Sequence, residues 1–226
     1  MKQGGSDAAK RAAGESAAEA VEDGMVVGLG TGSTTAHAIR AIGGQVDAGI
    51  DVVGVPTSFQ SRELAREVGI PLSDLDEVSV DLAIDGADEV ADGDLIKGGG
   101  AAHAREKVVD ASADRFLVVA DPTKTADVLS HPVPVEVLSA ARTTVAASVR
   151  DLGGEPTLRQ AERKDGPVVT DNGNLVLDCE FGPIEAPGAL GSELAGLPGV
   201  VEHGLFVGLA DAVHVGGEDG VTVREL

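Results

Sequence analysis

Aromatic residues are almost missing from this chain of 226 residues, which has four Phe and neither Trp nor Tyr. A core without large rings must be built mostly from Val, Ala, Leu and Ile, which favours sheets and Ala-rich helices. Hydrophobic residues still make up 42% of the chain, which argues against a disordered polyanion. At this length, folding buries roughly 70% of the surface of the unfolded chain, enough for one domain or a domain plus a smaller one.

Positive charge is also scarce. The chain has 17 Lys and Arg against 38 Asp and Glu, so its formal net charge is −21. Such a surface repels phosphodiester backbones and anionic lipid heads, which makes nucleic acid and membranes poor partners. Excess carboxylate with few lysines indicates adaptation to high salt, where counterions screen the self-repulsion. We therefore expect a halophilic source.

Cysteine is represented by Cys179 alone, which follows the apolar run Leu175 to Leu177. Its position predicts a small core residue and no disulfide, which fits a reducing compartment. Residues 1–14 lack the apolar stretch of a signal peptide, and no window approaches 18 consecutive apolar residues. These absences predict a soluble, cytoplasmic protein.

Helix-like and strand-like segments alternate in the first half of the chain. Helices are expected at 6–21, 33–42, 58–68 and 101–111, and strands at 25–29, 50–55, 80–84 and 115–119. Such alternation predicts a parallel sheet covered by helices on both faces, in a Rossmann-like arrangement. Ligands of such sheets bind at the carboxyl ends of the strands.

A second unit is expected to begin near His131. Its expected strands are 133–138, 156–160, 175–180 and 200–206, and its expected helices are 140–152 and 186–195. This β-α-β-β-α-β order is the ferredoxin-like split motif. Short strands at 211–215 and 221–223 are placed to return to the first sheet. The predicted fold is therefore α/β: a Rossmann-like catalytic domain, residues 1–130 plus 207–226, with a smaller ferredoxin-like α+β domain, residues 131–206, inserted near the C-terminus.

The first candidate site is the glycine-rich turn from Gly28 to Thr34, between an expected strand and helix. Its backbone N–H groups and the helix N-terminus are suited to a phosphate or another anion. It departs from both nucleotide motifs, because the dinucleotide fingerprint has Gly at the position of Ser33 and the P-loop has Lys before a Ser or Thr. A glycine-rich turn without a ligand is the alternative.

Two carboxylates follow the expected strand at 80–84. Asp85 and Asp88 lie three residues apart at its carboxyl end, where they could bind sugar hydroxyls or move protons. A calcium loop does not fit, because Gly86, Ala87 and Val90 interrupt its ligand spacing. The alternative is a solvated acidic turn of an acidic protein.

A lysine and a glutamate complete the candidates for catalysis. Lys97 precedes three glycines and can stabilise a developing oxyanion, while Glu106, on the helix that follows, can take a proton from carbon. Taken alone, Glu106 also fits an ordinary surface glutamate. His103 is expected to be solvated, and the other histidines lack the spacing of metal ligands, so no metal site is expected. Lys124, just past another strand, is either a substrate contact or a surface lysine.

These motifs, in this order and spacing, resemble the type A family of ribose 5-phosphate isomerases over nearly the whole chain. The resemblance is carried by residues 30–34, 56–60, 85–89, 97–102, 105–107 and 169–174. The segment Pro-Thr-Ser-Phe-Gln at 56–60 is similar to the archaeal and eukaryotic branch. That similarity agrees with a haloarchaeal-like protein.

The resemblance implies a cofactor-free aldose-ketose isomerase of the non-oxidative pentose phosphate pathway, which interconverts D-ribose 5-phosphate and D-ribulose 5-phosphate through a cis-enediol. It implies that catalysis rests on Glu106, Asp85, Asp88 and Lys97, with Glu106 as the proton acceptor. The implied substrate-binding residues are Thr31, Gly32, Ser33, Thr34, Asp85, Gly86, Ala87, Asp88, Lys97, Gly98, Gly99, Gly100 and Lys124. Lys10 falls where the family places another basic residue. A homodimer or homotetramer is also implied.

Two other functions are compatible with parts of this pattern. A non-catalytic sugar-phosphate sensor would need the phosphate loop but not Glu106, although such regulators usually add a helix-turn-helix, for which no segment is spare. A lactonase, deaminase or acyl-CoA transferase of similar architecture is the alternative among enzymes. Ketose formation from ribose 5-phosphate in molar salt would separate these possibilities.

Overall fold

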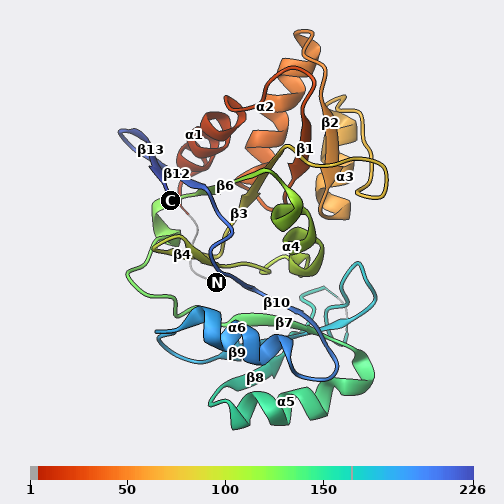
Figure 1. Ribbon diagram of the computed structural model, residues 1–226, viewed down its shortest axis with the longest axis vertical. Coiled ribbons are helices and arrows are strands. Elements are labelled where there is room, and N and C mark those ends of the chain that lie inside the picture. The colour runs from red at the N-terminus through yellow and green to blue at the C-terminus, as the bar shows by residue number, and fades with distance from the viewer. Residues whose placement is uncertain (1–4, 164) are drawn as a thin grey trace. The chain divides into compact units, whose positions relative to one another are not determined.

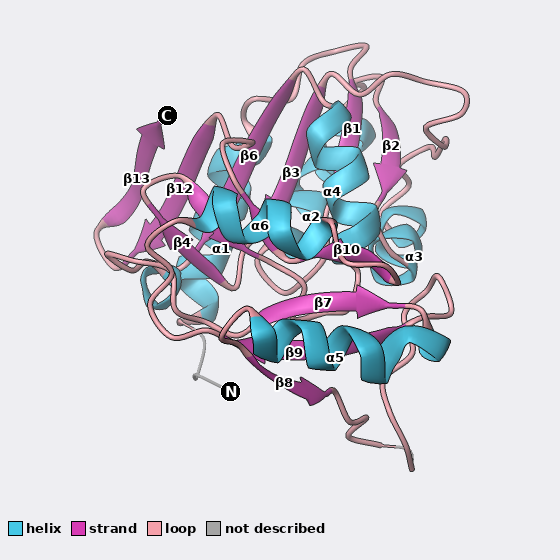
Figure 2. Cartoon of the chain, turned by 60° about the horizontal axis from the view of Figure 1, so that its bottom comes forward, coloured by secondary structure: helices cyan, strands magenta, loops and turns pink. Residues whose placement is uncertain are grey.

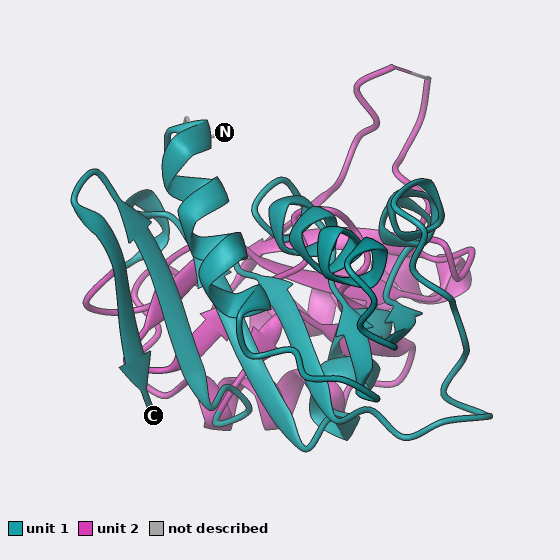
Figure 3. Cartoon of the chain, turned by 90° about the horizontal axis from the view of Figure 1, so that it is seen from above, with its two compact units in different colours: residues 1–87, 105–125, 208–226 teal, residues 88–104, 126–207 magenta. Residues whose placement is uncertain are grey.

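The computed structural model describes residues 5–163 and 165–226, and the chain divides into two compact units (Figures 1 and 3). Unit 1 consists of residues 1–87, 105–125 and 208–226, and unit 2 of residues 88–104 and 126–207. The sequence-based division assigned residues 88–130 to the first domain, whereas the compact units place 88–104 and 126–130 in unit 2. Two short strands account for 88–104: β4 (Glu89–Ala91) and β5 (Asp94–Ile96) form a sheet with β11 (Leu205–Phe206).

Unit 1 contains a six-stranded sheet with the order β13-β12-β6-β3-β1-β2. Its strands are β1 (Val26–Leu29), β2 (Val53–Pro56), β3 (Leu82–Gly86), β6 (Arg115–Ala120), β12 (Ala212–Gly217) and β13 (Gly220–Glu225). Neighbours from β2 to β12 pair in parallel, while β13 pairs antiparallel with β12. The five parallel strands have the doubly wound order 2-1-3-4-5, in which the winding reverses between β1 and β3.

The helices of unit 1 lie where the sequence predicts them (Figure 2). They are α1 (Asp7–Ala18), α2 (Thr35–Asp47), α3 (Phe59–Glu67) and α4 (His103–Ser112), of which α4 belongs to unit 1 from Arg105 onward. Ser6 caps α1, because its hydroxyl accepts the N–H of Ala9 at 3.2 Å. Ser58 caps α3 in the same way through the N–H of Ser61.

The core of unit 1 consists mainly of aliphatic side chains, as its composition predicts. The larger cluster includes Ala13 of α1, Ile39 of α2 and Ile84 of β3, all buried. A smaller cluster joins Val55 of β2 to Val109 of α4. Small residues allow these close contacts: a Cβ on Gly28 would lie 2.7 Å from Cγ1 of Val109. This packing fixes α4 against the sheet and thereby positions Glu106.

Unit 2 contains a four-stranded antiparallel sheet with the order β10-β7-β9-β8. Its elements are β7 (Val133–Val137), α5 (Arg142–Asp151), β8 (Glu155–Leu158), β9 (Leu175–Glu180), α6 (Pro187–Ala195) and β10 (Val200–His203). The predicted β-α-β-β-α-β order is confirmed. Cys179 is fully buried in the core of this unit, as predicted.

The prediction of one strand over 200–206 is wrong. The chain changes from the sheet of β10 to the sheet of β11 at Gly204, whose N–H donates to the carbonyl of Pro134 at 2.7 Å and whose carbonyl accepts the N–H of Lys97 at 2.8 Å. A Cβ on Gly204 would lie 2.2 Å from the carbonyl oxygen of Lys97. Only a glycine allows this crossing.

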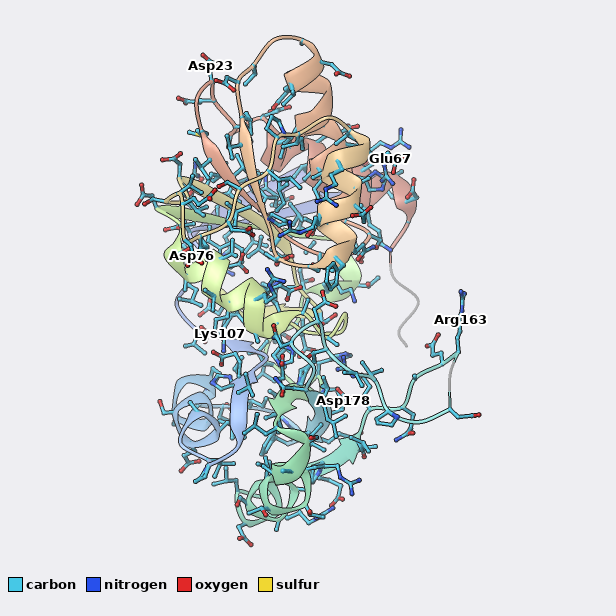
Figure 4. The ribbon with its side chains drawn as sticks, turned by 90° about the vertical axis from the view of Figure 1, so that its right-hand side faces the viewer. Asp23, Glu67, Asp76, Lys107, Arg163 and Asp178 are labelled. Carbon is cyan, nitrogen blue, oxygen red and sulfur yellow. The ribbon has the colours of Figure 1, made fainter. Side chains whose placement is uncertain are left out.

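Most of the acidic side chains lie at the surface. Asp23, Glu67 and Asp76 are exposed on unit 1, as Figure 4 shows. None of the helices in the described residues combines the length and the apolar character that crossing a membrane requires.

Candidate functional site

Apart from Glu106, the predicted site residues of unit 1 follow the carboxyl ends of its parallel strands. Residues 30–34, here called the glycine loop, follow β1, Asp85 and Gly86 end β3, and Lys124 follows β6. Because β1 and β3 flank the point where the winding of the sheet reverses, their ends form the place where ligands bind in doubly wound sheets. The fold therefore places these residues at one edge of one sheet.

Asp85 holds the glycine loop in place. Its Oδ1 accepts the N–H of Thr31 at 2.9 Å and the N–H of Gly86 at 2.6 Å. The side chain is fully buried, which excludes a solvated acidic turn. Gly30 is required here, because a Cβ at that position would lie 2.1 Å from Cγ of Asp85.

The hydroxyl of Thr31 is held by two residues that follow β2. It donates to Oγ of Ser58 at 2.7 Å and lies 3.0 Å from Oγ1 of Thr57. Both partners are buried. They were not among the predicted site residues, although they lie in the segment 56–60 that carries the family resemblance and follow a predicted strand.

The backbone of the glycine loop is shaped for an anion. Gly32 has a left-handed φ of 109°, and α2 begins at Thr35 directly after the loop. The first N–H groups of a helix have no partner within the helix and carry its positive partial charge. A phosphate group would find its donors at residues 32–35.

Glu106 lies in the first turn of α4 and is 4% exposed. Its burial excludes the ordinary surface glutamate that the sequence also allowed. Asp110, one helical turn later, is buried as well.

Lys124 is the last residue of the 3₁₀-helix η1 (Pro122–Lys124), and it is half-buried. Asp121 caps this turn by accepting the N–H of Thr123 at 2.9 Å and its hydroxyl at 2.6 Å. Burial alone would raise the pKa of Asp121, but the hydrogen bonds from Thr123 and Gly5 and the charge of Lys124 outweigh it and lower the pKa. Asp121 therefore stays ionised and fixes the backbone before Lys124.

The remaining predicted residues belong to unit 2. Residues 97–101, here called the Lys97 loop, follow β5. Lys97 is 2% exposed, and its Nζ lies 5.3 Å from the centroid of the Phe206 ring, within the range of a cation–π interaction. Asp88 accepts the N–H of Gly99 on its Oδ2 at 2.7 Å. The Lys97 loop thus contains a buried cation, and the carboxylate of Asp88 binds its backbone.

Asp85 and Asp88, which the sequence places three residues apart, serve different loops. Asp85 binds the glycine loop within unit 1, and Asp88 binds the Lys97 loop within unit 2. Their spacing along the chain therefore does not make them a simple carboxylate pair.

The prediction that His103 is solvated is wrong. His103 is fully buried, and a Cβ on Gly98 would lie 2.7 Å from its Nδ1, so the ring packs directly against the Lys97 loop. Gly98 has a φ of 106°, which also requires glycine. Over the described residues, no group of three or more His, Cys, Asp or Glu side chains is arranged to hold a metal ion.

Residues 53–220 match the protein family described as Ribose 5-phosphate isomerase A (phosphoriboisomerase A). The ribose-5-phosphate isomerase A of Haloarcula marismortui is 80% identical to this chain, over 100% of this chain and 99% of that protein. This haloarchaeal relative agrees with the salt adaptation predicted from the charge.

Two solved structures are similar over nearly their whole length. Ribose 5-phosphate isomerase A from Methanocaldococcus jannaschii has a TM-score of 0.93 and 44% identity, covering 96% of this chain and 98% of that chain. A D-ribose-5-phosphate isomerase in complex with phospho-erythronic acid has a TM-score of 0.94 and 43% identity, covering 96% of this chain and 97% of that chain. The α/β fold with its smaller antiparallel sheet is thus shared with both.

Proposed function

The chain belongs to the ribose 5-phosphate isomerase A family, and we propose that Glu106 is the base that moves a proton between two carbons in this family's reaction. The chain is an isomerase that interconverts ribose 5-phosphate and ribulose 5-phosphate in the pentose phosphate pathway. Its substrate is therefore a sugar phosphate, and the complex of a relative with phospho-erythronic acid agrees with that class of ligand.

The burial of Glu106 is the observation that supports its role best. Glu106 is 4% exposed in the first turn of α4, and it is one of six carboxylates that are buried among the described residues of a chain with 38 acidic residues. Burying a carboxylate costs free energy, so its position calls for a specific role. A carboxylate shielded from water can take a proton from carbon and return it to the neighbouring carbon.

We assign the steps as follows. After ring opening, Glu106 removes the proton from C2 of the aldose and delivers it to C1 of a cis-enediol, on one face of the sugar. Lys97 stabilises the negative charge of the enediolate. Asp85 and Asp88 assist ring opening and exchange protons with the hydroxyl groups. The family resemblance, rather than the geometry, assigns residues of both units to one substrate.

The phosphate is assigned to the glycine loop, with Lys124 as a further contact. Backbone N–H groups of residues 32–34 and the N-terminus of α2 supply donors without a cluster of basic side chains. This explains how a chain with a net charge of −21 can bind an anionic substrate. Lys10, in α1, stays a prediction as another basic residue at the site.

Replacing Glu106 by Gln tests this assignment. A positioned general base contributes on the order of 10²- to 10⁴-fold, so Glu106→Gln should lose at least about a hundredfold in kcat while still binding sugar phosphate. Glu67→Gln, an exposed glutamate on α3, is the matched control and should keep kcat within about twofold. The measurement is ketose formation from ribose 5-phosphate in molar KCl with EDTA, together with calorimetric binding. Near-normal turnover by Glu106→Gln would remove Glu106 from the role of base.

We further propose a homodimer or homotetramer, which the family resemblance supports. Sedimentation equilibrium in molar KCl tests this state, and a monomer at micromolar concentration would contradict it. A cytoplasmic location stays a prediction from the composition.

A further inference from the structure

We propose that Arg159 is a positioning residue for catalysis, which holds the Lys97 loop in its working conformation by binding the backbone of the loop. The inference rests on the proposed function, because the loop matters for turnover only if Lys97 and Asp88 act on the substrate. Neither the motifs of the sequence nor the family resemblance pointed to Arg159. All the residues that carry the argument belong to unit 2.

The side chain of Arg159 binds the backbone of the Lys97 loop directly. Arg159 follows β8, and its Nη1 donates to the carbonyl of Gly98 at 2.8 Å and to the carbonyl of Gly99 at 3.2 Å. The loop is 60 residues away along the chain, so local sequence does not impose this contact. Two successive carbonyls of the loop therefore point toward one guanidinium group.

Asp178 fixes the orientation of that guanidinium group. Nε of Arg159 donates to Oδ2 of Asp178 at 2.9 Å, and Nη2 donates to Oδ1, which makes a two-pronged ion pair. Asp178 lies in β9, at the position labelled in Figure 4. The side chains are 16% and 30% exposed, so water weakens this pair less than an exposed one. The remaining Nη1 is thereby aimed at the loop.

The peptide geometry connects Arg159 to Asp88. In a trans peptide the carbonyl and the N–H point in opposite directions. Because the carbonyl of Gly98 faces Arg159, the N–H of Gly99 in the same peptide faces the other way, where it donates to Oδ2 of Asp88 at 2.7 Å. One peptide plane is thus held by Arg159 on one side and by Asp88 on the other.

The loop needs such support because its backbone is strained. Ala101 has a left-handed φ of 59°, which is uncommon for a residue other than glycine, and its N–H donates to the carbonyl of Gly98 at 2.9 Å. Gly98 itself has a φ of 106°. Surrounding contacts must stabilise these conformations, and the Gly98 carbonyl that Arg159 binds is also the acceptor that closes the turn from Gly98 to Ala101.

The alternative is that the ion pair only joins β8 to β9. A joining role and a positioning role differ in what the folded variants do. If the ion pair only connects β8 to β9, its loss lowers the stability of the protein and leaves the turnover of the folded protein unchanged. Loss of a positioning group lowers kcat, because displacing a catalytic group by about 1 Å costs on the order of 10²-fold.

The test compares Arg159→Ala, Arg159→Lys and Asp178→Asn with the control Arg150→Ala. Arg150 lies in the same unit, and its ion pair with Glu155 is exposed, at 3.5 Å. We expect Arg159→Ala to lose at least about thirtyfold in kcat with KM changed by less than about threefold, and Arg150→Ala to keep both within about twofold. Arg159→Lys should recover part of kcat, since an ammonium reaches one carbonyl but cannot form the two-pronged pair. Asp178→Asn should lose less than Arg159→Ala.

A second measurement separates positioning from stability. Methylguanidinium added at millimolar concentration should raise kcat of Arg159→Ala several-fold and leave Arg150→Ala unchanged, with folding checked by circular dichroism in molar KCl. The inference is overturned if folded Arg159→Ala keeps kcat within threefold of the wild type, or if only KM changes. If Arg159→Ala does not fold, folded Arg159→Lys and Asp178→Asn decide instead: a lowered kcat with KM changed by less than about threefold supports the inference, and an unchanged kcat in both overturns it. An inactive wild type would instead overturn the proposed function, whereas an active wild type with an inactive Glu106→Gln leaves that function intact.

Discussion

A methyl group added at Gly30 should inactivate the protein without unfolding it. The Cβ of Gly30→Ala would lie 2.1 Å from both Cγ and Oδ1 of Asp85, far inside the 3.0 Å below which real Cβ contacts essentially never fall. Asp85 must therefore move by about 1 Å or more before ordinary van der Waals contact is restored. The side chain is buried and has no open space in which to swing toward water.

The cost follows from what Asp85 holds. Its Oδ1 accepts the N–H of Thr31 at 2.9 Å and that of Gly86 at 2.6 Å, and a shift of this size weakens both. Each hydrogen bond to a charged group is worth about 1.5–3 kcal/mol, and the overpacking itself costs about 1–3 kcal/mol. Because the two bonds are weakened and not lost, the total stays below their sum of about 4–9 kcal/mol, and a domain stable by about 5–15 kcal/mol stays folded with a lower unfolding midpoint. Turnover should fall by about 10²-fold, because the glycine loop and a catalytic carboxylate are displaced together.

The assay follows ketose formation from ribose 5-phosphate and unfolding by circular dichroism, both in molar KCl. Gly44→Ala is the matched control, because it lies in α2 with no heavy atom within 4 Å of its added Cβ. We expect it to keep full activity and to gain about 0.5–1 kcal/mol of stability. The reasoning is refuted if Gly30→Ala has a kcat within threefold of the wild type and an unchanged unfolding midpoint.

Three further predictions concern stability and reactivity. His214 lies 3.0 Å from Oγ of Ser16, and burial, helped by the charge of Arg115, lowers its pKa, so the folded state favours the neutral ring. The contribution of His214 to stability should be full above about pH 6.5, where the histidine of the unfolded chain is neutral, and should fall as the pH drops below this value. Urea unfolding midpoints measured from pH 7 to pH 5 should therefore fall less in His214→Gln than in the wild type. Burial, helped by the charge of Asp178, raises the pKa of the Cys179 thiol to about 12, so a disulfide reagent at pH 8 should label the native protein far more slowly than the urea-unfolded one. Equal labelling rates would contradict this. A net charge of −21 predicts a higher thermal midpoint in molar KCl than in dilute buffer, and a flat midpoint would disprove salt adaptation.

Local patterns predicted most of the helices and strands of both units. Apolar strands such as β1 are followed by glycines and then by the polar start of a helix. The type and the position of these elements could therefore be inferred from neighbouring residues. Ser6 and Ser58 mark their helix starts through their own hydroxyl groups. Elements of this kind depend on contacts within a few residues.

The hairpin of β4 and β5 was missed, although its turn has a recognisable signal. Asp92 and Gly93, with φ of 49° and 91°, form the left-handed pair typical of a two-residue hairpin turn. The strands have only three residues each, too few to show a pattern. Their sheet is completed by β11, more than a hundred residues later, and no local rule finds such a partner.

The same difference between local signals and long-range contacts separates the site residues that were predicted from those that were not. The glycine loop, the carboxylates Asp85 and Asp88, and Lys124 stood out because each follows a predicted strand. Lys97 stood out because it precedes three glycines, and Glu106 because it lies on the predicted helix after them. The burial of His103 against Gly98 and the contact of Arg159 with the Lys97 loop depend on tertiary packing, which a single sequence does not display. The need for a glycine at position 30, next to Asp85, also depends on tertiary packing.

Proton transfer by Glu106 is the central claim, and isotope exchange tests it most directly. The protein is incubated with ribose 5-phosphate in D₂O with molar KCl and EDTA, and both sugar phosphates are examined by NMR as equilibrium is approached. An enediol formed by a carboxylate base predicts deuterium at C2 of ribose 5-phosphate and at C1 of ribulose 5-phosphate, since a proton held by the base exchanges with solvent. Glu106→Gln should show neither. Interconversion that keeps every carbon-bound proton, as in a direct hydride shift, would contradict the account.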